Sequence, residues 1–448
     1  LYLRELPRSG DPQKRTLAAY ISHSLIESQA GFDLPPDFFQ QLLRQGEAVI
    51  LLLDGLDEVP NEAERVKVRR AIEDLVTGRE NMRVVVTCRT AAYQGRTALG
   101  KGFREVKVKP LEAAHIAALV EQAYHHIYRT DPTLQTKKSA ELLAGIDHLE
   151  AERRRRLGKD APPLVDSPLM VRLLLIVHYS ERRRLPEQRA ELYMKATDAM
   201  LLPDYAPDED VTEQIGRAVG GSMEIHRDLM QHLAFHMHQK GEKQGREVSE
   251  AALREIMAQE PLYGGMVDDL IALTRVRGTL LEERMGMYRF LHLAFQEYLA
   301  ARYLAEILRG EGGVAAIAEF LEQGPLLDSW WREVALLTPG YLMVTSAPTA
   351  QLLLQRLAGL DKEAEKRMLP ADVELAAAEV AATAFWEWGA PRPELQEMQT
   401  AISQKLVGLL TDRGRAEQSK PPRRAAVGVA LARLGDPRPE VLDVDAMQ

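Results

Sequence analysis

The sequence contains a single cysteine and no long apolar run. Cys88 is the only cysteine among 448 residues, which excludes an intrachain disulfide and a cysteine-based zinc site. No apolar stretch approaches the roughly 20 residues that a membrane-spanning helix needs, and no secretory signal peptide is visible. We therefore expect a cytoplasmic protein that does not enter a membrane.

An excess of positive charge is also missing. The formal net charge is -9 and the pI is about 5.8, whereas a nucleic-acid-binding domain normally carries a basic surface. Two short arginine runs, Arg153–Arg156 and Arg182–Arg184, are interpreted as solvated helix faces. Nucleic acid is therefore not an expected partner.

The first part of the chain alternates between strand and helix patterns. Short apolar runs predict strands at 1–6, 49–53, 83–89 and 104–111, and the stretches between them predict helices at 15–29, 36–44 and 61–77. Strands separated by helices form parallel sheets through right-handed crossovers. Because the run "VILLL" at 49–53 has no polar position, it predicts a strand that is buried on both faces.

Helix patterns replace strand patterns after residue 111. They predict helices at 112–128, 137–158, 165–180 and 187–202, and Pro168 takes a first-turn position. The prolines and acids of Pro203–Asp210 indicate a linker. Helices are then expected at 228–239, 249–258 and 266–276, before a β-hairpin that turns at Arg284–Gly286. Three helices followed by a hairpin are typical of a winged helix, and a long amphipathic helix follows.

The chain from about Gly313 onward is predicted to be almost entirely helical. Proline and glycine pairs divide it into short helices, which we interpret as irregular HEAT-like hairpins, with breaks at Gly324-Pro325, Pro339-Gly340, Gly389–Pro393 and Pro421-Pro422. The expected fold class is multidomain α/β plus α. Its domains are a P-loop-type parallel α/β core that is N-terminally incomplete (1–130), a helical domain (131–205), a winged-helix domain with the following helix (206–310) and a HEAT-like helical region (311–448).

The segment "VILLLDGLDEVP", Val49 to Pro60, indicates the chemistry. A parallel strand ends at the sheet edge where α/β proteins bind ligands, and in P-loop NTPases the first acid after such a strand is the Walker B aspartate. Asp54 would therefore hold Mg²⁺ through its water shell. Asp57 and Glu58 would lie near the γ-phosphate, where an acid can polarise the attacking water. The alternative is that Asp54 and Asp57 are helix caps and Glu58 is a surface residue.

The string "LLLDGLDE" resembles the NACHT signature, and other stretches resemble NACHT proteins at their expected places, from residue 1 to about 308. "VVVTCRT" resembles the next strand, which implies that Arg89 is the sensor that reads the γ-phosphate. "SPLMVRLLL" resembles the helical domain and implies that Pro168 packs near the adenine. "YRFLHLAFQEYLAA" resembles the end of the winged helix and implies that His292 contacts the β-phosphate of ADP.

Each of these residues also has an ordinary interpretation when it is considered alone. Arg89 would be a salt-bridging surface arginine, Pro168 would open a helix without a ligand, and His292 would be a satisfied core histidine. His232 and His236 have the spacing of a helical zinc pair. Leu233 stands where a metalloprotease carries its glutamate, so we interpret this helix as structural.

A phosphate-binding loop of the form G-x-x-x-x-G-K-[ST] is missing from the sequence. The nearest string is "GRTALGKG" at 95–102, in which Gly102 takes the place of the Mg²⁺-binding hydroxyl. It also follows the sensor strand, whereas in this family the loop precedes Walker B. We interpret the string as a surface loop and expect the phosphate-binding loop upstream of Leu1 in the parent protein.

The resemblance implies a bacterial NACHT-type STAND ATPase that acts as a signalling switch. ADP would hold a closed state, and ATP with Mg²⁺ would favour an open form that self-associates and activates an attached effector, in anti-phage defence. Slow hydrolysis would reset the switch through Asp54, Asp57, Glu58 and Arg89. A trigger, expected to be a protein, would act on the C-terminal helical region.

The last residues, "ALARLGDPRPEVLDVDAMQ", resemble the junction that precedes a formylglycine-generating-enzyme-like domain, which would lie outside this chain. Two other functions stay open. One is a nucleotide-independent helical-repeat scaffold with a vestigial ATPase core, and the other is a winged-helix transcription regulator.

Overall fold

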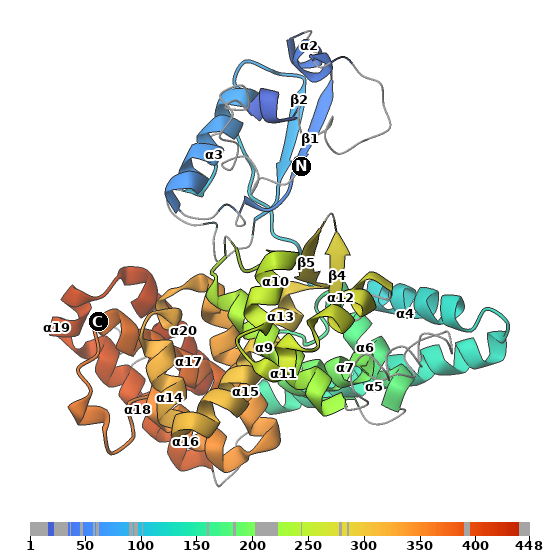
Figure 1. The fold of residues 1–448 in the computed structure, drawn as a ribbon. Helices are drawn as coiled ribbons and strands as arrows, with labels where there is room; N and C mark the ends of the chain where they lie inside the picture. The colour runs from blue at the N-terminus through green and yellow to red at the C-terminus, as the bar shows by residue number, and fades with distance from the viewer. Residues whose placement is uncertain are drawn as a thin grey trace. The chain divides into compact units, whose positions relative to one another are not determined.

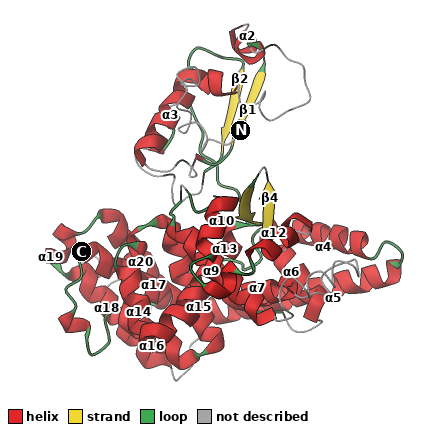
Figure 2. Ribbon diagram, in the orientation of Figure 1, coloured by secondary structure: helices red, strands yellow, loops and turns green. Residues whose placement is uncertain are grey.

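The computed structural model shows mostly helices, together with a small parallel sheet and a small antiparallel sheet (Figures 1 and 2). It describes residues 17–21, 35, 37–44, 48–56, 59, 62–88, 93, 97–100, 102–158, 161–181, 185–201, 223–242, 244–276, 280–284, 286–388 and 395–438. The chain divides into two compact units, Leu1–Val108 and Lys109–Gln448, and each is described by itself below.

The first unit contains two parallel strands, as predicted. β1 (Val49–Leu53) pairs with β2 (Met82–Val86), in a register that runs from Val49↔Met82 to Leu53↔Val86. α3 (Glu62–Val76) connects the strands, α2 (Phe38–Arg44) precedes them, and residues 17–21 are also helical. Leu51, Leu53 and Ile72 are buried together, because the apolar strand packs its inner face against α3.

Two of the strand predictions in this unit are wrong. β1 is not buried on both faces, because Ile50 is 72% exposed and Leu52 is 61% exposed; among the described residues only the face with Leu51 and Leu53 is covered. Residues 104–111 form no strand, and Val106 and Val108 point to solvent. Alternating apolar and charged residues cannot form a strand without a neighbour that accepts their hydrogen bonds. The strand predicted at 1–6 lies outside the described residues.

The second unit begins with the predicted helical segment. It consists of α4 (Ala113–Ile127), α5 (Pro132–Leu157), α6 (Pro168–Glu181) and α7 (Arg189–Leu201). Asp131 caps α5 by accepting a hydrogen bond from the Leu134 N–H at 2.9 Å. The buried Glu150 carboxylate of α5 accepts bonds from Leu164 N and Val165 N at 2.8 and 2.9 Å, which fixes the segment that leads into α6.

The predicted winged helix is present. It comprises α9 (Met223–Gln239), β3 (Val248–Ser249), α10 (Glu250–Met257), α11 (Pro261–Gly264), α12 (Val267–Val276), β4 (Leu281–Arg284) and β5 (Met287–Phe290). The sheet order is β3-β5-β4, and both pairs are antiparallel. Gly286 adopts a φ of 78° in the hairpin turn, a value that favours glycine. The predicted linker at 203–210 lies outside the described residues.

The remaining described chain is almost entirely helical. α13 (Leu293–Tyr303) continues into a π-helical turn, η6 (Leu304–Leu308), and then α14 (Arg309–Glu322). The following elements are η7 (Pro325–Leu327), η8 (Ser329–Trp331), α15 (Arg332–Thr345), α16 (Ala347–Leu357), η9 (Ala364–Lys366), α17 (Ala371–Trp388), α18 (Gln396–Thr411), α19 (Arg413–Gln418) and α20 (Pro421–Leu434).

One predicted break in this region is wrong. Pro339 and Gly340 lie inside α15 and do not end it. A Cβ atom at Gly340 would come within 3.2 Å of the Ala190 Cβ, so glycine at this position suits the close approach of α15 to α7. The break at Gly324-Pro325 and the helix start at Pro421 are confirmed, and the break at 389–393 lies outside the described residues.

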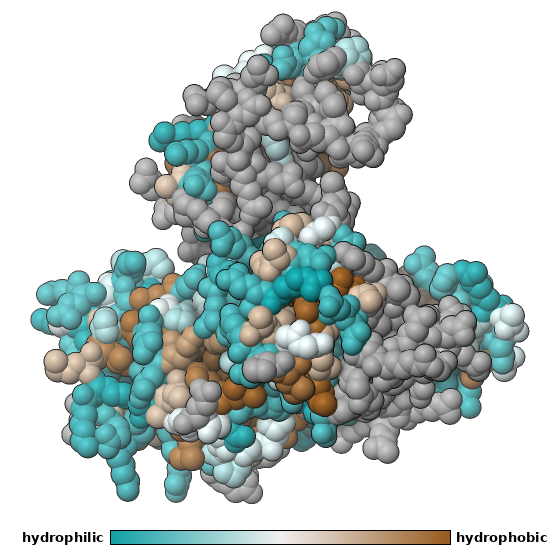
Figure 3. Space-filling model, viewed as in Figure 1, coloured by the Kyte–Doolittle hydropathy of each residue, from teal (hydrophilic) through white to brown (hydrophobic). Residues whose placement is uncertain are grey.

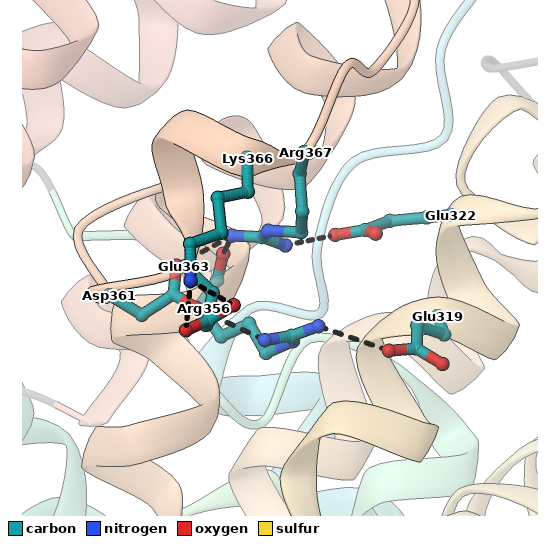
Figure 4. Close-up of polar contacts among 7 residues, drawn as sticks. All are labelled: Glu319, Glu322, Arg356, Asp361, Glu363, Lys366 and Arg367. Atoms are coloured by element: carbon teal, nitrogen blue, oxygen red, sulfur yellow. Dashed lines mark hydrogen bonds and ion pairs between the residues drawn. The ribbon is translucent and has the colours of Figure 1, made fainter.

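Two arginines connect the loop between α16 and α17 to α14 (Figure 4). Arg367 pairs with Glu322 and with Asp361 at 2.7 Å each. Arg356 pairs with Glu319 and with Asp361 at 3.1 Å each. Burial raises the pKa of Glu322, while the two arginines favour its ionised form. These ion pairs join α14, α16 and the loop before α17 at one edge of the helical region.

The surface of the helical region is largely polar. Figure 3 shows hydrophilic residues over much of the described C-terminal helices, with smaller apolar areas between them. No helix among the described residues is long and apolar enough to cross a membrane.

Candidate functional site

The structure describes three of the six predicted site residues. Asp54 lies in the first unit, and Pro168 and His292 lie in the second. Asp57, Glu58 and Arg89 lie outside the described residues.

Asp54 follows β1 directly, at the carboxyl edge of the parallel strand pair. Its carboxylate is exposed because the chain turns at Gly55, which has a φ of 77°. The parallel ladder continues beyond the strands, since Thr87 N donates to Leu53 O at 3.0 Å and Leu56 N donates to Thr87 O at 2.9 Å. Asp54 is thus held at the position where an α/β sheet presents ligand-binding groups.

A threonine that the sequence analysis did not single out completes this edge. The Thr87 hydroxyl donates to Asp54 Oδ1 at 2.5 Å and accepts a bond from Gly55 N at 2.9 Å. The register of the two strands shows its role, because Thr87 follows β2 at the position that corresponds to Asp54 after β1. Neighbouring parallel strands end at the same edge of a sheet, so the side chains of Asp54 and Thr87 lie next to each other.

The donor set of this edge fits a hydrated magnesium ion. Carboxylate oxygen is a ligand type that Mg²⁺ prefers, and the ion usually keeps several of its waters. No described residue donates to Asp54 Oδ2, so this oxygen can accept bonds from metal-bound water. Among the described residues, no group of three or more histidines, cysteines or acids could enclose a metal ion. Because Oδ2 can accept such bonds, Asp54 fits an ion that the protein contacts through water.

The string at 95–102 cannot act as a phosphate cradle where it is described. Gly100 N donates to the Glu73 carboxylate at 2.7 Å, and Leu99 N donates to the Tyr93 hydroxyl at 3.0 Å. An acidic side chain of α3 thus already occupies an amide that a phosphate would need. This agrees with its interpretation as a surface loop.

Pro168 opens α6, where its missing N–H costs nothing. The residue is exposed, and the backbone before it is fixed because Leu111 N donates to Asp166 O at 2.9 Å. The geometry of Pro168 thus has a sufficient local reason, and the contact with adenine stays a prediction.

His292 is the N-cap of α13 and not a core histidine. Its Nδ1 accepts a hydrogen bond from Ala294 N at 3.1 Å, with a backbone φ of -148° and ψ of 143°. The side chain is exposed, which rules out the buried alternative. A neutral ring in this arrangement carries its proton on Nε2. His292 therefore presents an N–H donor at a helix N-terminus, where the helix dipole favours anions, and its contact with ADP stays a prediction.

The histidines of α9 take structural positions. The rings of His232 and His236 lie 4.3 Å apart, and His232 Nε2 lies 3.2 Å from Ile256 O. Burial lowers the pKa of both, to about 4 for His236. Tyr263 and Tyr303 pack against the His232 ring, so the pair belongs to an aromatic cluster.

The winged helix carries exposed acidic residues on α12. Asp268 and Asp269 are exposed in the first turn of α12, and Arg254 pairs with Asp268 at 2.7 Å. Acidic side chains at this position repel phosphate groups. The structure thus disfavours a transcription regulator that reads DNA through α12.

Two family models match the chain. Residues 1–127 match the NACHT domain, and residues 189–304 match the winged helix-turn-helix domain C-terminal to NACHT. The fold and the matches define a protein in which an α/β domain, with Asp54 at the carboxyl edge of its parallel strands, is followed in sequence by a winged helix. The chain therefore contains a NACHT domain, as its signature predicted, and the winged helix that follows such a domain. Among curated proteins, none matches the chain.

Proposed function

We propose that the protein is a STAND-type NTPase, a signalling switch controlled by ATP and ADP. The observation that carries this proposal is Asp54, which lies at the carboxyl edge of the strand pair inside the NACHT match. Its carboxylate is exposed and oriented by Thr87. An exposed acid held in one orientation at a sheet edge suits ligand binding better than fold stability.

Asp54 would accept hydrogen bonds from the water shell of Mg²⁺ in the bound state. When bound, ATP with Mg²⁺ supplies the charged phosphates whose presence or absence distinguishes the two states of the switch. Asp57, Glu58 and Arg89 would act near the γ-phosphate during slow hydrolysis. His292 and Pro168 would favour the ADP-bound closed state through differential contacts.

The packing of α15 supports an input through the C-terminal helices. α15 contacts α7 of the helical segment as well as α13, which follows the wing. Arg189 of α7 pairs with Glu333 of α15 at 2.7 Å and with Glu387 of α17 at 3.6 Å. A partner that displaced α15 would therefore act on both α7 and α13, and α13 is the helix that His292 caps.

Several finer features belong to the same proposal. The region 311–448 would be a HEAT-like array that senses a trigger, expected to be a protein. The ATP-bound form would self-associate and activate an attached effector, in bacterial anti-phage defence. A formylglycine-generating-enzyme-like domain after residue 448 is the proposed continuation.

The substitution Asp54→Ala tests the proposal. We expect Mg²⁺-dependent ATP turnover by the full-length protein to fall at least ~10-fold, since the loss of an interaction with a metal-bound transition state costs a few kcal/mol. The free energy of unfolding should change by less than ~0.5 kcal/mol, because the side chain is exposed. Turnover in a Mg²⁺ titration and urea unfolding are the two measurements.

Equal loss of turnover and of stability would contradict the metal-anchor role of Asp54. A protein with wild-type turnover after this substitution would favour the helical-repeat scaffold, in which the acid is vestigial.

A further inference from the structure

The Thr87 hydroxyl makes two hydrogen bonds in the described structure. It accepts one hydrogen bond, from Gly55 N, and donates one, to Asp54 Oδ1. A hydroxyl has a single hydrogen to donate. Because the Gly55 N–H is itself a donor, the hydroxyl hydrogen must point to the carboxylate, and the direction of this bond is fixed by chemistry.

The backbone fixes Thr87 as firmly as the side chain does. Its N–H and C=O both extend the ladder with the chain after β1, to Leu53 O and from Leu56 N. The Gly55 N–H donates to the Thr87 hydroxyl at 2.9 Å. Two backbone bonds and two side-chain bonds therefore hold the hydroxyl against Asp54, and the carboxylate cannot rotate without breaking one of them.

This arrangement divides the carboxylate between two tasks. Oδ1 is bound to Thr87, whereas Oδ2 receives no bond from a described residue. A carboxylate that acts through metal-bound water needs an oxygen free for that water and a fixed plane. The Thr87 hydroxyl, which donates to Oδ1, fixes this plane and leaves Oδ2 available.

We propose that Thr87 is a positioning residue, which orients the Asp54 carboxylate toward the water shell of nucleotide-bound magnesium. The inference rests on the proposed function and adds a residue from the second strand to the site.

The test measures how strongly Mg²⁺ and nucleotide support each other in the full-length protein. The quantity is the ratio of the ATP Kd without Mg²⁺ to the ATP Kd with Mg²⁺. We expect Thr87→Val to lower this ratio by about tenfold, as loss of outer-shell partners of a metal ligand typically does. Thr87→Ser keeps the hydroxyl and should restore the ratio to within about twofold of wild type.

Two controls separate positioning from stability. Thr77→Val removes a hydroxyl that bonds only to a helix carbonyl, Glu73 O at 2.8 Å, and should leave the ratio unchanged. In an Asp54→Asn background, Thr87→Val should cause no further change in the ratio, because the residue acts through Asp54. Thr87→Val also removes the acceptor of the Gly55 N–H. A melting temperature that falls equally in the wild-type and Asp54→Asn proteins would be due to this lost bond. Should Thr87→Val not fold, Thr87→Ala leaves room for water at the hydroxyl position and serves the same test.

The outcomes are distinguishable. A folded Thr87→Val variant with the wild-type ratio overturns this inference and leaves the proposed function in place, as does an equal further loss in the Asp54→Asn background. A wild-type protein that binds no ATP with or without Mg²⁺ overturns the proposed function, and this inference with it. A reduced ratio that Thr87→Ser restores supports the positioning role.

Discussion

Two charged groups, one in each unit of this protein, are held in opposite ways. In the first unit, Asp54 is exposed and a single hydroxyl bonds to its side chain. In the second, Arg302 of α13 is only 5% exposed at its side chain and donates twice to Glu306 at 3.1 Å. The ring of Tyr341 lies 5.3 Å from its guanidinium, and the Tyr341 hydroxyl donates to Glu306.

The difference teaches which charges serve the fold and which can serve a ligand. A buried ion pair must be complete, because an unpaired charge in the interior is costly. An exposed acid contributes little to stability and can exchange its water for another partner. The Arg302 group joins α13, η6 and α15, whereas Asp54 joins nothing that the fold requires.

The largest expected effect is on the buried side of this comparison. Arg302→Met should lower the free energy of unfolding by about 3 kcal/mol, because it leaves Glu306 and Asp198 without their buried partner. Lys366→Met, in the exposed pair with Glu363 at 3.1 Å, is the matched control and should cost less than ~1 kcal/mol. Urea unfolding followed by tryptophan fluorescence measures both. Similar losses of unfolding free energy in the two variants would contradict the distinction between the buried and the exposed ion pair.

Acid should also destabilise the second unit selectively. Burial lowers the pKa of His226 to about 4, and burial, with Arg246 nearby, lowers that of His238 to about 3. The unfolded chain, with a histidine pKa of about 6.5, binds protons first, so this stability is complete above that pH and is lost as the pH falls. Between pH 6.5 and 5 the loss is roughly 2 kcal/mol for each residue.

This prediction is checked by unfolding at pH 7 and pH 5. The first unit contains a single histidine, His23, so its unfolding should change less. His226→Leu should remove its own share of the acid sensitivity. Equal stability of the second unit at the two pH values would show that these histidines are not held neutral by burial.

The smallest expected effect on stability is at His292. Asparagine is an equally good N-cap, so His292→Asn should change the free energy of unfolding by less than ~0.5 kcal/mol. It removes the Nε2–H donor, and the proposed function therefore predicts faster release of ADP. Stopped-flow displacement of a fluorescent ADP analogue measures the rate, and an unchanged rate would remove His292 from the site.

The sequence predicts most of the elements that carry the site. Continuous apolar residues at 49–53 and 84–86 give β1 and β2, and the pattern around Gly286 gives the hairpin of the winged helix. These elements are predictable because local pattern and burial agree. Asp54 was found because the acid follows the apolar run directly.

Other features depend on contacts that a local pattern cannot show. β3 has two residues and exists because β5 offers it a partner. Residues 104–111 alternate like a strand but have no partner strand among the described residues. Pro339-Gly340 lies inside a helix, where the glycine suits the approach of α15 to Ala190. Thr87 was missed because its role requires the register of β1 against β2. Tertiary pairing decides each of these cases.

The most direct test of the account is to identify the nucleotide that the protein carries. Full-length protein is purified, denatured, and the released nucleotide is separated by chromatography and compared with the protein concentration. The account predicts ADP or ATP in near-stoichiometric amount. A folded protein that releases no nucleotide and ignores added ATP with Mg²⁺ would contradict it.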